Sequence, residues 1–270
     1  WRADETHPEI PSVLPVHAGT RVTAPLVNPV FIADLHLSPF KRRTARAFFD
    51  FMKTTAPLYR ELFILGDLFE FWLGDDAAWI AGPVTKALAA YSATGRKLYL
   101  MQGNRDELLG ADYAAATGAV LLAPQTPVVT AAGTRILLSH GDEWCTLDPD
   151  YQAFRTMMRD PAWQTMALEK TFCGRIAYAL KARRHSKTQK KVKTPEVMDV
   201  VENEVEASAR RENCTYVIHG HTHKPANHTD LAVPRCVIPD WRLDGEANGR
   251  YGWVTVTEDG GPELVIRRDR

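Results

Sequence analysis

Five short apolar runs recur along the chain, and each of them ends in polar residues that can bind a metal ion. With those polar ends, the runs are "VFIADLHLS", "LFILGDLFE", "KLYLMQGNRD", "RILLSHGDEW" and "YVIHGHTHKP". Continuous apolar runs of this length are typical of strands buried on both faces. The stretches between the first three runs, "TARAFFDFMKTTAPLYR" and "AAWIAGPVTKALAAYSATG", have helical spacing and helix-forming residues. The alternation predicts an α/β fold in which sheet and helices are layered.

The polar residues that end these runs are candidate ligands. In open α/β sheets, ligands bind beyond the carboxyl ends of the strands, so five such ends bring their polar groups together. A single Gly-Asp pair or a single histidine is more often turn chemistry, but five in the same local context favour a binding site. The predicted set is Asp34, His36, Asp67, Asn104, His140, His221 and His223.

This set is large enough for two metal ions. One zinc-like ion takes about four ligands, whereas two ions that share a carboxylate suit the whole set. Such pairs belong to phosphatases and nucleases, where they clamp the attacking and leaving oxygens. Nitrogen and oxygen ligands without thiolate favour manganese, iron or zinc. His219, His221 and His223 point the same way on a strand, so their spacing leaves open which of them is not a ligand.

The composition excludes several other classes of protein. The 270 residues suit one large domain or a domain with an insertion, and a hydrophobic fraction of 45% supplies a substantial core. A formal net charge of zero argues against a generally basic nucleic-acid-binding protein. The four cysteines show no C-x-x-C spacing, so we expect neither a zinc ribbon nor a disulfide framework. Residues 1–28 lack periodicity and predict a loosely held arm, and we expect neither an export signal nor a transmembrane helix.

A long helical segment, residues 150–213, separates the fourth and fifth runs and divides the predicted core into 29–149 and 214–270. Thr194 and Pro195 are the expected start of its last helix. Residues 170–193 hold nine lysines or arginines and no acidic residue. This stretch is either a solvated helix face or a surface that attracts anionic lipid head groups and a diphosphate. The apolar residues of the same helices are either ordinary packing or the inner face of a lid.

The five polar blocks resemble the pattern of the calcineurin-like metallophosphoesterases, which is D-x-H, GD, GN-x-D/E, H and GH-x-H. All five are present here in that order. The resemblance implies a four-layer α/β/β/α sandwich with a helical lid. It also implies that His219 is the histidine that does not bind metal and that Asp67 bridges two ions. One ion would be held by Asp34, His36 and His223, and the other by Asn104, His140 and His221.

One position departs from the wider family, in which a histidine often follows the asparagine. This chain has Arg105, whose forked guanidinium suits clamping a phosphate rather than delivering a proton. With Arg105, the chain resembles one family in particular, the UDP-2,3-diacylglucosamine diphosphatases of bacterial lipid A synthesis. The stretches that carry this resemblance are "GDLFEFWLGDD", "GNRDELLG", "SHGDEWCTLDPDYQAFR" and "HGHTHKPANH". That resemblance implies Arg105, Asp67 and Asn104 as catalytic residues. It implies substrate contacts at Asn104, Arg105, Asp148, Ser186, Lys190, Lys193 and His221, where Lys190 replaces a frequent asparagine.

The resemblance therefore implies hydrolysis of UDP-2,3-diacylglucosamine to 2,3-diacylglucosamine 1-phosphate and UMP. Water activated by two divalent ions, expected to be manganese, would attack the α phosphorus. The enzyme would lie on the cytoplasmic face of the inner membrane as a peripheral protein, with no nucleic acid and no obligate protein partner. Two alternatives remain: a phosphodiesterase or pyrophosphatase of the same fold acting on a soluble nucleotide, and a non-catalytic scaffold. The complete ligand set argues against the scaffold, and the basic, apolar insertion argues against a soluble substrate.

Overall fold

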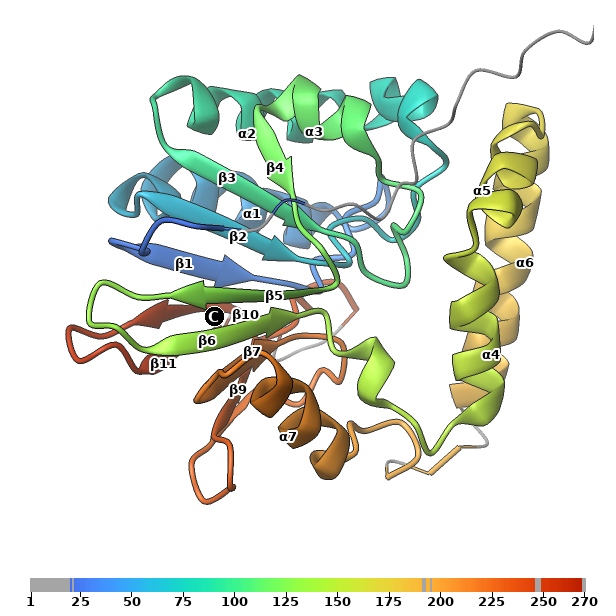
Figure 1. The fold of residues 1–270 in the computed structure, drawn as a ribbon. Coiled ribbons are helices and arrows are strands. Elements are labelled where there is room, and N and C mark those ends of the chain that lie inside the picture. The colour runs from blue at the N-terminus through green and yellow to red at the C-terminus, as the bar shows by residue number, and fades with distance from the viewer. Residues whose placement is uncertain (1–19, 21, 191–192, 195, 246–248, 269–270) are drawn as a thin grey trace, which may run out of the picture.

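Two β-sheets that face one another form the centre of the molecule (Figure 1). The computed structural model describes residues 20, 22–190, 193–194, 196–245 and 249–268. The first sheet has the order β11-β10-β1-β2-β3-β4. Strands β1 to β4 are parallel to one another, β10 is antiparallel to β1, and β11 is antiparallel to β10. Its strands are β1 (Pro29–Ile32), β2 (Glu61–Leu65), β3 (Lys97–Met101), β4 (Ala119–Leu121), β10 (Arg250–Val256) and β11 (Pro262–Arg268).

The second sheet has the order β5-β6-β7-β9-β8. Its three central strands are parallel to one another, and the two edge strands are antiparallel to their neighbours. The strands are β5 (Gln125–Val129), β6 (Arg135–Ser139), β7 (Tyr216–His219), β8 (Ala226–His228) and β9 (Arg235–Val237). All five predicted apolar runs are therefore strands, three in the first sheet and two in the second.

Alternating side chains of each strand supply two different cores. Phe31 and Phe63 face the second sheet and pack against residues such as Ile218, within the core between the sheets. Their neighbours Ile32 and Ile64 point the other way and pack against helices. Both faces of these strands are buried, which explains why their sequences are continuously apolar rather than alternating.

Helices cover the outer face of each sheet. Over the first sheet lie α1 (Arg42–Thr54), α2 (Gly82–Ala93) and α3 (Ala111–Thr117) (Figure 1). In α1 the helical spacing of Phe48, Phe51 and Met52 places all three in that core. Over the second sheet lies α7 (Glu202–Arg211), which packs Val205 and Ala209 against its strands. The predicted four-layer α/β/β/α sandwich is confirmed.

Three more helices stand beside the sandwich (Figure 1). They are α4 (Pro149–Met158), α5 (Pro161–Leu168) and α6 (Phe172–Lys190), and we refer to them together as the lid. Asp148 caps the first of them, since its Oδ1 accepts a hydrogen bond from Tyr151 N at 3.1 Å. Short 3-10 helices complete the described structure: η1 (Ala56–Leu58), η2 (Asp75–Ala81) and η3 (Asp142–Trp144).

The segment expected to form the lid, residues 150–213, is divided in the structure. Only α4 to α6 stand apart, because α7 belongs to the outer layer of the second sheet. This last helix begins at Glu202 rather than near Thr194, since Val201 N donates instead to Trp144 O, at 2.8 Å. Pro195 lies outside the described residues.

The end of the expected N-terminal arm is attached to the sandwich. Leu26 is 2% exposed and lies in the core between the sheets, and its N–H donates to Val129 O at 2.8 Å. Residues 1–19 and 21 lie outside the described structure. Among the described residues, no helix has both the length and the apolar character that crossing a membrane requires.

Candidate metal centre and adjoining cavity

The predicted ligands meet at the carboxyl ends of five strands. Loops after β1, β2 and β3 of the first sheet and after β6 and β7 of the second converge there, at the edge nearest the lid (Figure 1). They carry Asp34 and His36, Asp67, Asn104, His140, and His221 and His223 in that order. Segments almost 190 residues apart in the chain thus contribute to one site.

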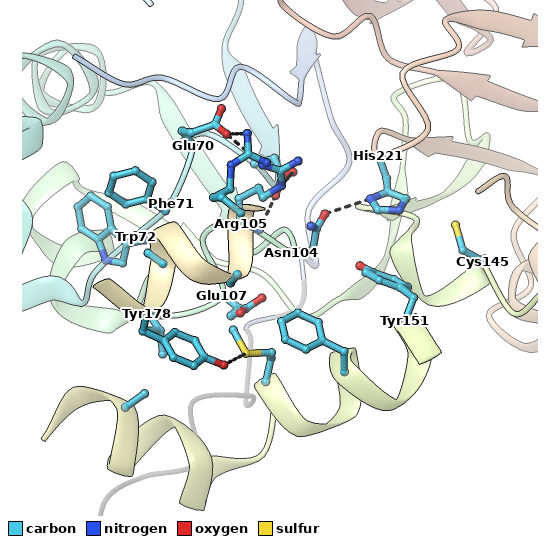
Figure 2. A pocket seen from close by; sticks show the side chains of 18 of the residues that line it. Glu70, Phe71, Trp72, Asn104, Arg105, Glu107, Cys145, Tyr151, Tyr178 and His221 are labelled. Carbon is cyan, nitrogen blue, oxygen red and sulfur yellow. Dashed lines mark hydrogen bonds and ion pairs between the residues drawn. The ribbon is translucent and has the colours of Figure 1, made fainter. Parts of the chain in front are cut away.

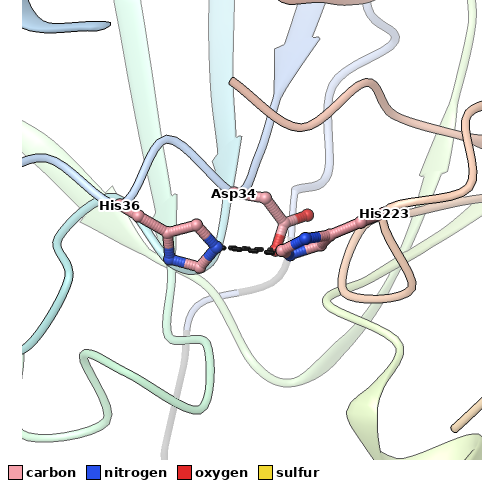
Figure 3. A group of neighbouring side chains, drawn as sticks. All are labelled: Asp34, His36 and His223. Carbon is pink, nitrogen blue, oxygen red and sulfur yellow. Dashed lines mark hydrogen bonds and ion pairs between the residues drawn. The ribbon is translucent and has the colours of Figure 1, made fainter. Parts of the chain in front are cut away.

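Asp34, His36 and His223 form the first cluster (Figure 3). His223 Nε2 lies 3.2 Å from His36 Nε2 and 3.3 Å from Asp34 Oδ1. Asp34 Oδ1 and His36 Nδ1 are buried, and neither has a hydrogen-bond partner within the described protein. Buried polar atoms that converge without partners are what a cation would satisfy, so these residues fit a metal ion.

Asn104, His140 and His221 form the second cluster. Asn104 Oδ1 lies 3.1 Å from His221 Nδ1 and 3.2 Å from His140 Nε2, and the two imidazole nitrogens are 3.3 Å apart. The other nitrogen of His140, Nδ1, lies 3.0 Å from Leu65 O. That contact orients the ring so that Nε2 faces the cluster.

Asp67 lies between the two clusters. Its Oδ2 is 3.6 Å from His36 Nδ1, and its Oδ1 is 3.7 Å from His140 Nε2. Oδ1 also accepts a hydrogen bond from the backbone N–H of Arg105 at 2.8 Å. One oxygen therefore faces each cluster, which is the geometry of a carboxylate that can bridge two ions.

The backbone that presents these side chains is unusual. In the described chain six non-glycine residues have a positive φ, and five of them are predicted ligands: Asp34, His36, Asp67, His221 and His223. Non-glycine residues adopt this conformation at a cost, and such residues cluster at functional sites. A Cβ on Gly220 would strike the carboxylate of Asp34, so glycine is required where this loop approaches β1.

The electrostatics of the clusters also suit a cation. Burial raises the pKa of Asp67 to about 6, although the neighbouring His140 opposes the shift. Burial alone would lower the pKa of His140, but the carboxylates of Asp67 and Asp34 raise it to about 9. Without a cation, these buried carboxylates depend on protons held by the neighbouring imidazoles.

Two carboxylates that the sequence analysis did not single out support the ligands. Asp106 is buried and accepts hydrogen bonds from the backbone N–H groups of Asp67 at 3.1 Å and Gly103 at 2.8 Å. Asp240 Oδ2 lies 3.5 Å from His223 Nδ1 and can orient that ring. Asp106 stands inside the block "GNRD", which was the available signal, whereas nothing near Asp240 marks it as a partner of His223.

Glu70 holds three basic side chains at the edge of the site. Its Oε1 lies 3.0 Å from Arg105 Nη1 (Figure 2). The same oxygen also contacts Arg183 of α6. Glu70 Oε2 lies 2.9 Å from Lys41 Nζ. The guanidinium of Arg105 is thereby fixed beside the two clusters of candidate ligands, and Arg183 links the lid to the same carboxylate.

His219 lies outside both clusters. Its Nδ1 is 2.9 Å from Gly220 O, and its Nε2 is 3.3 Å from Arg235 Nη1. Burial, reinforced by the charge of Arg235, lowers its pKa to about 3. Of the three histidines whose roles the spacing left open, the structure directs His221 and His223 toward the clusters.

A cavity of about 750 Å³ extends from the metal centre to the lid (Figure 2). Asp67, Asn104, Arg105 and His221 line one end. Most of the remaining wall is apolar and comes from the lid and the loop after β2, with Trp72, Leu73, Phe154, Met158, Trp163, Met166, Ala167 and Ala179.

Two of the other four predicted substrate contacts lie at the cavity, and the side chains of the other two are not described. Asp148 and Lys193 both line the cavity and form an ion pair, with Lys193 Nζ 2.5 Å from Asp148 Oδ2. The side chains of Ser186 and Lys190 lie outside the described residues.

Comparison with known proteins identifies a family and several relatives that agree with this arrangement of residues. Residues 28–225 match the model of the calcineurin-like phosphoesterase family. A UDP-2,3-diacylglucosamine hydrolase of Bordetella pertussis is 41% identical over 244 residues, which cover 87% of this chain and 94% of that protein. The similarly named proteins of Cellvibrio japonicus and Chromobacterium violaceum are 39% and 42% identical, over 83% and 86% of this chain and 97% and 95% of their own length.

Proposed function

The chain belongs to the calcineurin-like phosphoesterase family and, within it, to the UDP-2,3-diacylglucosamine hydrolases, and we propose accordingly that it hydrolyses the pyrophosphate bond of UDP-2,3-diacylglucosamine. The products are 2,3-diacylglucosamine 1-phosphate and UMP, in lipid A synthesis. The observation that carries this proposal is the contact between a cluster of metal ligands and a large apolar cavity. A soluble nucleotide would use the ligands but would leave that cavity without a role.

Two divalent ions complete the proposed centre. Asp34, His36 and His223 would hold one ion, and Asn104, His140 and His221 the other, with Asp67 shared. When bound, such ions activate water as a nucleophile and withdraw charge from phosphoryl oxygens. We propose manganese for both, since the ligands are imidazole, carboxylate and amide groups without a thiolate.

Arg105 and the residues around it would bind the diphosphate. The Arg105 guanidinium is fixed by Glu70 on one edge and can donate to phosphoryl oxygens with its remaining N–H groups. Lys193, held by Asp148, adds a second cation at the cavity wall. The proposed attack is at the uridine-side phosphorus, and Asn104 and His221 would lie beside the reacting group.

The lid would take the acyl chains and rest against the membrane. The cavity wall that it supplies is apolar, and several apolar side chains also lie exposed around it: Trp79 is 71% exposed, Met166 50% and Leu180 47%. Helix α6, which carries Leu180, also has the basic residues Arg175, Lys181, Arg183 and Arg184. Apolar anchors beside basic groups are typical of proteins that bind reversibly to anionic lipid surfaces. We propose peripheral association with the cytoplasmic face of the inner membrane.

The test compares UDP-2,3-diacylglucosamine with unacylated UDP-glucosamine under the same conditions. We expect rapid hydrolysis of the acylated compound and little of the other, because burial of each methylene contributes ~0.8 kcal/mol. Equal hydrolysis of both compounds would reject the lipid substrate and favour the soluble-nucleotide alternative.

A further inference from the structure

Several acidic side chains line the cavity, namely Asp67, Glu70, Glu107, Asp148 and Asp150. Glu107 lines the cavity and is 5% exposed (Figure 2). Among the described residues, none forms a hydrogen bond or an ion pair with its carboxyl group. A buried carboxyl group without a partner costs stability, so the presence of Glu107 in the cavity wall requires an explanation.

Hydrogen bonds from two other residues hold the backbone of Glu107 in this position. Gln102 Nε2 donates to Glu107 O at 2.9 Å and to Leu109 O at 2.6 Å, which fixes the loop that follows β3. From the lid, Gln164 Nε2 reaches Glu107 O at 3.5 Å and Met158 O at 3.2 Å. Both glutamine side chains are buried, so Glu107 is anchored from the sheet and from the lid at the same time.

The surroundings of Glu107 favour its neutral form. Burial raises the pKa of Glu107 well above its usual value, and the positive charge of Arg159 offsets this in part. Arg159 is itself bound to the buried Asp142, with Nη2 3.2 Å from Oδ2. A neutral carboxyl group carries one O–H donor and retains acceptor capacity, so it can bind an uncharged ligand oxygen inside an apolar cavity.

We propose that Glu107 binds an oxygen of the acyl part of the substrate, either an acyl carbonyl or a hydroxyl group on the chain. This inference rests on the proposed function and adds a residue that determines specificity. The apolar wall recognises the length of the chain, and Glu107 recognises a polar group at one point along it. A chain without that oxygen would leave the carboxyl group buried and unpaired, which is why one hydrogen bond can discriminate between ligands.

The test uses two variants of similar volume. Glu107→Met removes the polar group, and Glu107→Gln keeps a donor and an acceptor. With UDP-2,3-diacylglucosamine, we expect the KM of Glu107→Met to rise about tenfold, as for one lost hydrogen bond, and that of Glu107→Gln to change little. The kcat and the bound metal should remain at wild-type levels in both variants. Glu263→Met, at an exposed glutamate of β11 that does not line the cavity, is the matched control and should leave KM unchanged.

Substrate analogues then locate the oxygen. Replacing the 3-ester by an alkyl ether removes one carbonyl, and comparing plain with hydroxylated acyl chains tests the hydroxyl. On the compound that lacks the recognised oxygen, wild type and Glu107→Met should have the same KM. An equal rise in the KM of Glu107→Met on all compounds would assign the recognised oxygen to the amide carbonyl. Thermal unfolding distinguishes a role in ligand binding from a structural role. If Glu107 acts in binding, Glu107→Met should be at least as stable as wild type.

An unchanged KM in Glu107→Met, with wild type active on the diacylated substrate, would overturn this inference and leave the proposed function standing. A wild type that does not hydrolyse the diacylated substrate would instead overturn the proposed function, and the role of Glu107 with it.

Discussion

Replacement of Arg105 by lysine tests the proposed phosphate clamp. The guanidinium can contact Glu70, whose Oε1 lies 3.0 Å from Nη1, and a phosphate at the same time, because its N–H groups point in several directions. A lysine ammonium that pairs with Glu70 loses most of its reach toward the diphosphate. Loss of one such donor to the transition state costs ~3 kcal/mol, about a hundredfold in rate. We therefore expect kcat/KM of Arg105→Lys to fall about a hundredfold.

The metal content should not change in this variant. Asp67 accepts its hydrogen bond from the backbone N–H of Arg105, which the substitution keeps. The assay is steady-state release of UMP, combined with elemental analysis of the purified protein. Arg96→Lys is the matched control, because Arg96 lies before β3, at the opposite end of that strand from the site. A near-normal rate for Arg105→Lys, or a rate loss explained by missing metal, would remove Arg105 from the catalytic residues.

Three further predictions concern the metal centre. Chelation should abolish turnover and added manganese should restore it; full activity in protein shown by elemental analysis to be metal-free would contradict the two-metal proposal. Asp67→Ala should lower activity more than substitution of any other ligand, since its two oxygens face different clusters; a milder loss than in His36→Ala would argue against a bridging role. His221→Ala should lose bound metal while His219→Ala retains it, and equal metal loss in both would show that the ligands of the last motif are wrongly chosen.

The strands and their polar ends could be predicted from the sequence because both depend on local patterns. A strand buried on both faces has a continuous apolar run, and ligands at carboxyl ends follow it directly. The pattern is the same whichever sheet a strand enters, so β3 and β6 look alike although they lie in different sheets. The division into two sheets and four layers came from the family resemblance, not from periodicity.

The parts that could not be predicted depend on contacts between distant segments. The amphipathic pattern of α7 shows that one face is buried, but not that Val205 and Ala209 bury it against the second sheet rather than over the cavity. Glu70 is one acidic residue among many until the fold brings Arg105 and Arg183 to it. Likewise, only the folded chain places the buried carboxyl group of Glu107 in the wall of the cavity.

The most direct test of the central claim is hydrolysis of UDP-2,3-diacylglucosamine in water enriched in heavy oxygen, with both products analysed by mass spectrometry. The proposed reaction predicts one heavy oxygen in UMP and none in 2,3-diacylglucosamine 1-phosphate, because water attacks the uridine-side phosphorus. Heavy oxygen in the lipid phosphate would show attack at the opposite phosphorus, and the absence of both products would contradict the assignment of this enzyme to UDP-2,3-diacylglucosamine.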